Sequence, residues 1–254
     1  MADSGAVLKA LKGAKQTQQL YMVYQPIFNL RTGRICAFEA LMRWNSPEMG
    51  MVPPDMFISL LENSGQFLAV EEMVTKTPWE TAAGWPEYLS LSINFSALEL
   101  CDPQLPARVQ HNLAKYGLDP RRCAIEVTET QPLYECQIAA KNMRELKALG
   151  ITFALDDFGT GHANLDYLLR YPFDTLKMDK SFLAAVPEGA RSAQLVEGII
   201  SLAHNVGVEA LAEGVEEEAQ NDWLIGMGCD KAQGFYFSPP IPPEAIPALL
   251  KRYS

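Results

Sequence analysis

The sequence predicts an α/β fold of the TIM-type (β/α)8 barrel class. Eight short apolar segments with strand character alternate with longer segments of helical periodicity, an order typical of parallel strands joined by crossover helices. The chain has 254 residues, which suits a single barrel of this kind. A doubly wound open sheet is the second choice, because the Gly-x-Gly-x-x-Gly turn expected after its first strand is missing.

The predicted strands are short apolar runs rich in β-branched and aromatic residues. They cover residues 21–29, 35–43, 89–95, 123–128, 152–157, 174–179, 208–213 and 232–237. Helical periodicity follows in residues 55–83, 135–150, 192–207 and 242–253. Gly150 and Gly207 close two of these segments, where a glycine commonly ends a helix. We expect residues 1–18 to be a lead-in with helical potential and residues 19–254 to form one domain.

Composition and charge argue against some classes of binding partner. The net charge is −10, and no basic patch is evident, which argues against a protein that binds duplex nucleic acid or an anionic membrane. No apolar run approaches the roughly 18 residues of a membrane span, and the first residues lack the apolar core of a signal peptide. The five cysteines are scattered, so we expect reduced thiols in a cytoplasmic protein.

Polar residues recur at the ends of the predicted strands, where barrel enzymes carry their chemistry. The positions are Glu39, Asn94, Glu126, Glu129, Asp156, Asp157, Lys177, Asp179, Glu213, Glu216 and Gln233. A single acidic residue at a strand end is usually a helix cap or a solvated loop residue. So many carboxylates at one mouth would repel one another, with only Lys177 and Arg43 nearby, so they must take up protons or hold cations.

The ligand types predict which cations these are. The candidate ligands are the oxygen atoms of Asp, Glu and one Asn side chain, with no His or Cys at the strand ends. Such sets of ligands favour Mg²⁺ or Mn²⁺ over zinc. Asp156 and Asp157 can share a site because the strand ends there and Gly159 and Gly161 supply a turn. The number of ligands suits two ions bridged by one aspartate, an arrangement for displacement at phosphorus in which Lys177 orients or deprotonates the attacking water.

Seven motifs in order make the chain similar to one known family. They read YQPIFNLRTGRICAFEALMRW (24–44), LSINFS (91–96), IEVTET (125–130), FALDDFGTG (153–161), LKMDKSF (176–182), LAEGVE (211–216) and AQGFYFSPP (232–240). This pattern resembles the EAL-domain phosphodiesterases from about residue 20 to the end. The resemblance implies a TIM-type barrel with one antiparallel strand and hydrolysis of cyclic di-GMP to linear pGpG, dependent on Mg²⁺ or Mn²⁺.

The resemblance also implies a role for each matching position. Glu39, Asn94, Glu126 and Asp156 would hold the first metal, and Asp156, Asp157 and Glu213 the second. Lys177 would contact the catalytic water, and Glu39, Lys177, Asp157 and Glu213 form the expected catalytic set. Substrate or metal-bound water would be supported by Gln25, Leu41, Arg43, Gln233 and Pro239. Glu129, Glu216 and Asp179 are expected to be supporting residues.

The departures from the family pattern are peripheral. His162-Ala163-Asn164 replaces the usual Tyr-Ser-Ser after the DDFGTG motif, and Glu62-Asn63 replaces a Glu-Glu pair. The alternatives are a module that binds cyclic di-GMP with little hydrolysis, and an enzyme for pGpG or another cyclic dinucleotide. The resemblance further implies a homodimer, and a regulatory protein partner is also considered.

Overall fold

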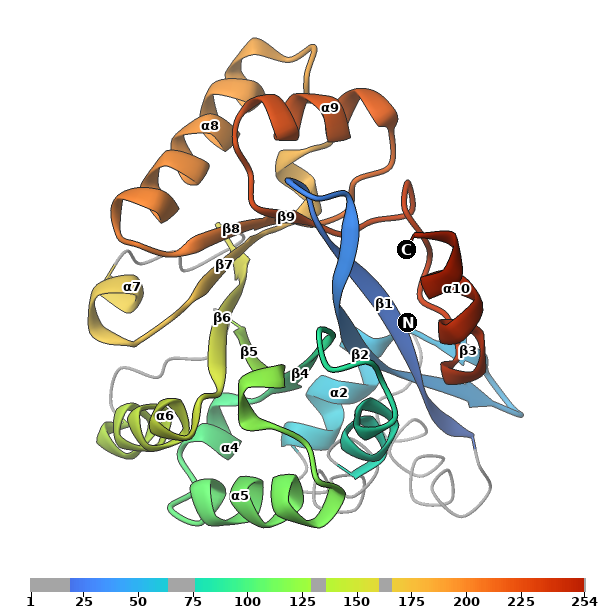
Figure 1. The fold of residues 1–254 in the computed structure, drawn as a ribbon, viewed down its shortest axis with the longest axis vertical. Coiled ribbons are helices and arrows are strands. Elements are labelled where there is room, and N and C mark those ends of the chain that lie inside the picture. The colour runs from blue at the N-terminus through green and yellow to red at the C-terminus, as the bar shows by residue number, and fades with distance from the viewer. Residues whose placement is uncertain (1–18, 64–75, 129–135, 160–165, 254) are drawn as a thin grey trace.

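The computed structural model describes residues 19–63, 76–128, 136–159 and 166–253, and within them the strands form a closed barrel (Figure 1). The strands are β1 (Leu20–Asn29), β2 (Arg34–Ser46), β3 (Gly50–Val52), β4 (Ser90–Phe95), β5 (Cys123–Thr128), β6 (Thr152–Phe158), β7 (Thr175–Met178), β8 (Glu209–Ala212) and β9 (Lys231–Ala232). Their order is β1-β9-β8-β7-β6-β5-β4-β2-β3, and pairing of β1 with β2 closes the ring.

One strand runs against the others, as expected. β1 pairs antiparallel with both β2 and β9, whereas β2, β4, β5, β6, β7, β8 and β9 follow one another in parallel. The short strand β3 pairs antiparallel with the end of β2 and lies outside the ring. The predicted class, a TIM-type barrel with one antiparallel strand, is therefore confirmed.

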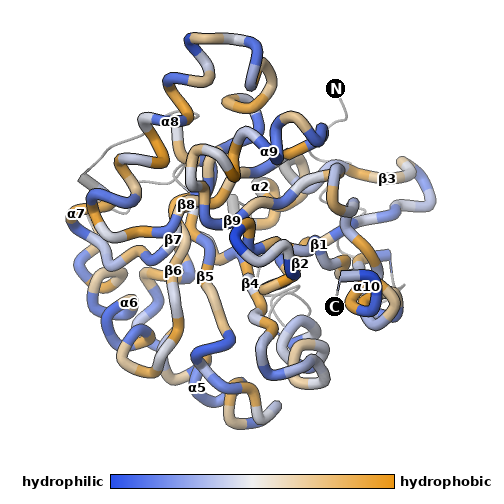
Figure 2. The backbone as a smooth tube through the Cα atoms, turned by 45° about the horizontal axis from the view of Figure 1, so that its top comes forward, coloured by the Kyte–Doolittle hydropathy of each residue, from blue (hydrophilic) through white to orange (hydrophobic). Residues whose placement is uncertain are grey.

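The helices surround the strands, and their apolar faces pack inward. They are α2 (Pro54–Asn63), α4 (Ala97–Leu100), α5 (Leu105–Tyr116), α6 (Gln137–Leu149), α7 (Asp166–Arg170), α8 (Ala190–Asn205), α9 (Glu218–Gly226) and α10 (Ile246–Arg252). Residues 76–83 are also helical. Along α5, α6 and α8, hydrophobic and hydrophilic residues alternate (Figure 2). In α6 the buried residues Ala139, Asn142, Met143 and Leu146 form one stripe at helical spacing.

Short 3₁₀ turns complete the chain at η1 (Pro120–Arg122), η2 (Lys180–Phe182) and η3 (Pro243–Ala245). Gly150 ends α6 with a φ of 108°, a left-handed conformation that its lack of a Cβ permits. Near the C-terminus, Tyr253 follows α10 and packs on β1, where its ring lies 4.8 Å from the ring of Phe28.

The eighth predicted strand is wrong over most of its length. The sequence predicts a strand over residues 232–237, but the strand ends at Ala232 and a turn follows. The amides of Phe237 and Ser238 both donate to the carbonyl oxygen of Gly234. Gly234 lies so close to the backbone of Val215 that a Cβ atom would collide with it. The chain therefore turns at Gly234 instead of extending the sheet.

The expectation of five reduced thiols is also corrected. Cys101, directly after α4, and Cys136, directly before α6, form a disulfide with their Cα atoms 6.2 Å apart. Cys36, Cys123 and Cys229 are free thiols. The spacing of 35 residues gave no indication of this contact, because it depends on two helices meeting in space. Within the described residues, no helix combines the length and the apolar character needed to cross a lipid bilayer.

Candidate active site

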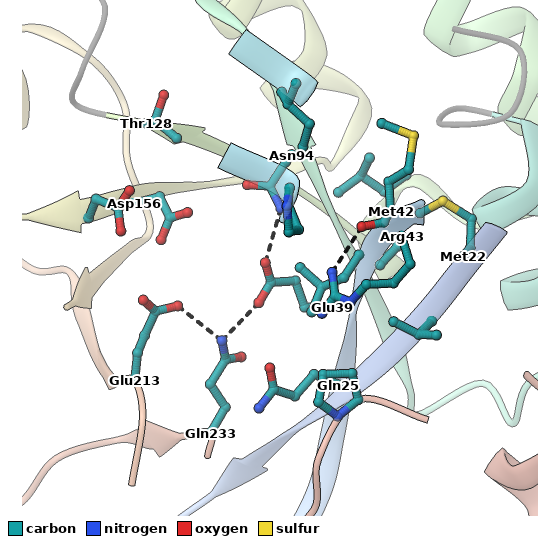
Figure 3. Close-up of a pocket in the computed structure, with 18 of the residues that line it drawn as sticks. Met22, Gln25, Glu39, Met42, Arg43, Asn94, Thr128, Asp156, Glu213 and Gln233 are labelled. Atoms are coloured by element: carbon teal, nitrogen blue, oxygen red, sulfur yellow. Dashed lines mark hydrogen bonds between the residues drawn. The ribbon is translucent and has the colours of Figure 1, made fainter. Parts of the chain in front are cut away.

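The carboxyl ends of the strands open into a cavity of about 1020 Å³. Residues from β1, β2, β4 and β6 line it, together with the segments that follow β7, β8 and β9. Figure 3 shows Glu39, Asn94, Asp156, Glu213 and Gln233 converging on its floor from separate strands. The polar residues that the sequence spreads over almost 200 positions are thus neighbours in the folded chain.

A buried lysine lies at the centre of this group. Lys177, on β7, is 1% exposed. Its Nζ atom lies 2.5 Å from Glu126 Oε2, 2.8 Å from Glu213 Oε1, 2.9 Å from Asp156 Oδ1 and 3.6 Å from Glu39 Oε2. Burial opposes the charge of the ammonium, but the four carboxylates together outweigh it and raise the pKa of Lys177 well above its usual value. The lysine therefore carries a full positive charge among the acids.

Two amide side chains hold Glu39. Asn94 Nδ2 donates to Glu39 Oε1 at 3.0 Å, and Gln233 Nε2 donates to Glu39 Oε2 at 2.8 Å. The same Gln233 nitrogen donates to Glu213 Oε1 at 3.0 Å, so it joins the acids of two strands (Figure 3). Burial works to raise the pKa of Glu39, but Lys177 and these hydrogen bonds prevail and lower it. Glu39 is thus an ionised carboxylate with both oxygens oriented.

Two other acids are held differently. Burial, followed by the nearby charges of Glu39 and Asp156, raises the pKa of Glu126 well above its usual value. Burial, again the largest cause, raises the pKa of Glu213 to about 8 despite the ammonium of Lys177. The ionised forms of these two carboxyl groups would therefore be stabilised by a further cation nearby, because burial makes ionisation unfavourable without one.

The adjacent aspartates share the site through an unusual backbone conformation. Asp157 has a φ of 54°, in the left-handed region that residues other than glycine rarely adopt. The pairing of β6 with β7 shifts register between Leu155 and Phe158, so the strand is already irregular here. Oxygen atoms of Asp156, Asp157 and Glu213 lie within 4.8 Å of one another. Strain at Asp157 thus brings two neighbouring side chains to one place, as strain often does at functional sites.

This trio is the part of the predicted ligand set that fits a cation most directly. Among the residues that the structure describes, Asp156, Asp157 and Glu213 form the group spaced to hold a metal ion. All their donors are carboxylate oxygens, which suit a hard divalent cation. Glu39 and Asn94 also line the cavity and contact each other, whereas Glu126 is buried beside Lys177, and neither Glu126 nor Lys177 is among the lining residues.

The remaining predicted residues lie around the rim, with two exceptions. Gln25, Leu41, Arg43, Asp179 and Glu216 line the cavity. Asp179 also caps η2 by accepting a hydrogen bond from the amide of Ser181 at 2.9 Å. Pro239 does not line the cavity, whereas its neighbour Pro240 does. Glu129 and His162-Ala163-Asn164 lie outside the described residues.

Several residues that shape the mouth were missed from the sequence. Tyr21, Met51 and Phe235 line the cavity, and Ser92 donates to Glu126 from β4. Ser92 could have been predicted from the sequence, because it lies two residues before Asn94 and therefore faces the same side of the strand. The other three lie in segments where apolar residues are common, so nothing in the sequence distinguished them.

Comparison with known proteins gives a consistent result over nearly the whole chain. A family model described as "EAL domain" matches residues 8–240. The chain is 38% identical over 245 residues to protein y4lL of Sinorhizobium fredii, covering 96% of this chain and 30% of that protein. It is 34% identical over 248 residues to the cyclic di-GMP phosphodiesterase NbdA of Pseudomonas aeruginosa, covering 96% and 32%.

A solved structure agrees with the sequence matches. The phosphodiesterase MucR from Pseudomonas aeruginosa, in complex with c-di-GMP, superimposes with a TM-score of 0.87 and 31% identity. That match covers 95% of this chain and 99% of the solved chain. The present chain spans about a third of the length of the curated relatives y4lL and NbdA.

Proposed function

Because the chain belongs to the EAL domain family, we propose that it is a metal-dependent phosphodiesterase that opens cyclic di-GMP to linear pGpG. One observation carries the proposal: carboxylate and amide groups from six strand units meet around Lys177 at one mouth. The names of two relatives support the choice of substrate, since NbdA is called a cyclic di-GMP phosphodiesterase and MucR was solved with c-di-GMP.

The residues fit a divalent cation, with Mg²⁺ or Mn²⁺ preferred by their oxygen donors. Asp156, Asp157 and Glu213 would hold one ion. Glu39, Asn94 and Glu126 would complete a second site that shares Asp156. When bound, such ions supply a Lewis acid for the phosphate oxygens and an activated water for attack at phosphorus.

The chain itself supplies orientation and charge. Lys177 places an ammonium group between the acids, where it can hold the attacking water and offset negative charge as it develops on the phosphate. Gln233 fixes the orientation of Glu39 and Glu213 through one amide nitrogen. Arg43 lies on the cavity wall, with Nη1 bound to the carbonyl oxygen of Met42 at 2.9 Å, and adds a second positive charge facing the dianionic substrate.

A hydrolysis assay tests this function. Purified protein incubated with cyclic di-GMP and Mn²⁺ should release pGpG, which chromatography separates from the substrate. Asp156→Asn and Lys177→Met should each lower kcat by roughly 100- to 10,000-fold, because the first removes the carboxylate that both proposed metal sites share and the second removes the ammonium group that would hold the attacking water. Lys147→Met is the matched control, since Lys147 pairs with Asp174 away from the mouth.

The outcomes separate the alternatives. Full activity in Asp156→Asn would refute the assignment of the site. Tight binding of cyclic di-GMP without product, with either metal, would indicate a receptor instead of an enzyme. Faster turnover of another cyclic dinucleotide, or of pGpG, in a small substrate panel would support phosphodiester hydrolysis but would assign a different substrate.

A further inference from the structure

Ser92, on β4, makes a buried hydrogen bond to one of the acids that surround Lys177. Its hydroxyl group donates to Glu126 Oε1 at 2.5 Å. Ser92 is 3% exposed and Glu126 is 1% exposed, so water cannot replace this partner without a rearrangement of the floor. The other oxygen of the same carboxylate, Oε2, contacts Lys177 Nζ. Glu126 is therefore held at one oxygen by a hydroxyl group and at the other by an ammonium group.

The position of Ser92 in the sheet explains how it reaches Glu126. Strand β4 lies between β2 and β5, and Asn94 on β4 pairs in register with Glu126 on β5. Ser92 and Asn94 point to the same side of β4 because side chains alternate along a strand. Asn94 donates to Glu39 on β2, while Ser92 donates to Glu126 on β5. Strand β4 thus supplies one donor to the acid of each neighbouring strand.

We infer that Ser92 is a positioning residue for the proposed phosphodiesterase. By occupying Oε1 of Glu126, it directs Oε2 toward Lys177 and the centre of the mouth. Without the hydroxyl group, a buried carboxylate oxygen loses its partner, and the side chain rotates toward other donors. Lys177 would then lose its shortest contact, and the acid would leave the orientation that the proposed metal site requires.

The kinetic part of this inference rests on the proposed function, so the experiment includes a readout that does not. Ser92→Ala removes the donor, Ser92→Thr keeps it, and Ser90→Ala is the matched control at the start of the same strand. For each, isothermal titration calorimetry measures the Mn²⁺ dissociation constant without nucleotide, and steady-state assays measure kcat and KM. Thermal unfolding identifies any variant that does not fold.

Ser92→Ala should weaken Mn²⁺ binding or lower kcat by roughly 10- to 100-fold, the usual effect of losing a group that orients a ligand. KM should change by less than about twofold, because Ser92 is buried beneath the floor and does not face the substrate. Ser92→Thr should restore most of the loss, and Ser90→Ala should behave like the unaltered protein. Wild-type behaviour of a folded Ser92→Ala variant in both measurements would overturn the inference.

The same substitution in a Glu126→Gln variant distinguishes a positioning role of Ser92 from general destabilisation of the fold. In Glu126→Gln the charged acceptor is gone, so adding Ser92→Ala should cause no further loss of Mn²⁺ affinity. An equal loss in both backgrounds would mean that Ser92 acts on the fold and not on Glu126, and would refute the proposed role. If the unaltered protein binds Mn²⁺ but hydrolyses nothing, the function fails while the Mn²⁺ measurements still decide the role of Ser92.

Discussion

Replacement of Lys177 by methionine is the most informative perturbation of the floor. Methionine retains much of the apolar stem but removes the ammonium group that contacts Glu126, Asp156, Glu213 and Glu39. The change leaves four acids, three of them within 3.0 Å of the lost nitrogen, without their shared counter-charge. No other cationic side chain of the described residues forms an ion pair with any of these acids.

The magnitude follows from the burial of the group. Breaking a buried ion pair by removing one partner costs about 3–5 kcal/mol, because the remaining charge is left uncompensated. In a domain of this size, 1 kcal/mol corresponds to a shift of about 2–4 °C in Tm, so a decrease of about 10 °C is expected. Lys147→Met, which breaks a half-exposed pair with Asp174, should cost only about 1 kcal/mol or less.

The size of the effect should depend on pH. The pKa values of Glu126 and Glu213 are already raised, and loss of the neighbouring ammonium raises them further. At about pH 5.5 the acids of Lys177→Met can take up protons, which relieves their repulsion, whereas at about pH 8.5 they cannot do so fully. Protein treated with EDTA should therefore show a larger loss of stability in Lys177→Met at the higher pH.

Thermal unfolding followed by circular dichroism checks this prediction. Added Mn²⁺ should raise the Tm of Lys177→Met more than that of the unaltered protein, because a divalent cation replaces the missing charge. A decrease in Tm of the same size at both pH values, or no larger than that of Lys147→Met, would show that the acids do not depend on the ammonium group.

Three further predictions concern the same fold. In EDTA-treated protein the folded state keeps a proton on Glu213, with its pKa of about 8, that the unfolded chain releases above the usual value of 4.5. The free energy of unfolding should thus decline between these pH values, and a rise would contradict the assignment. Thiol titration in denaturant should find three thiols before reduction and five after it. Reduction of the Cys101–Cys136 disulfide, which closes a loop of 35 residues, should cost up to about 4 kcal/mol; five thiols before reduction would exclude it. Gly234→Ala should lower Tm and activity because its Cβ atom would collide with neighbouring backbone, whereas Gly226→Ala, in open space at the end of α9, should lower neither.

The strand pattern made the acidic mouth predictable. Asp156 and Asp157 follow a buried apolar run, and period-two alternation in the other strands indicates which polar side chains face inward. Since parallel strands end at the same rim, the order of strands and helices along the chain is enough to predict that these residues meet. What the pattern could not supply was the contact made by each residue. Lys177 and Glu126 are 51 residues apart in the sequence, and it is the folding of the barrel that brings their side chains into contact.

The missed features have a common physical cause. The turn after Ala232 depends on the close approach of Gly234 to the backbone of Val215, which no local propensity expresses. The Cys101–Cys136 disulfide depends on the end of α4 meeting the start of α6. Both are contacts between segments that are distant in sequence, and they override what each segment prefers on its own.

The lysine at the centre of the acids also separates folding from cation binding. In small metal-dependent domains the unfolded chain contains no preformed site, so metal binding and folding are one event. Here Lys177 supplies positive charge from within the chain, and the barrel can close around its own ion pairs. The same contacts place the ammonium beside Asp156 and Glu213, two of the three acids spaced for a cation. An ion held there as proposed would share these oxygens with Lys177 and would therefore compete with its ammonium group for them.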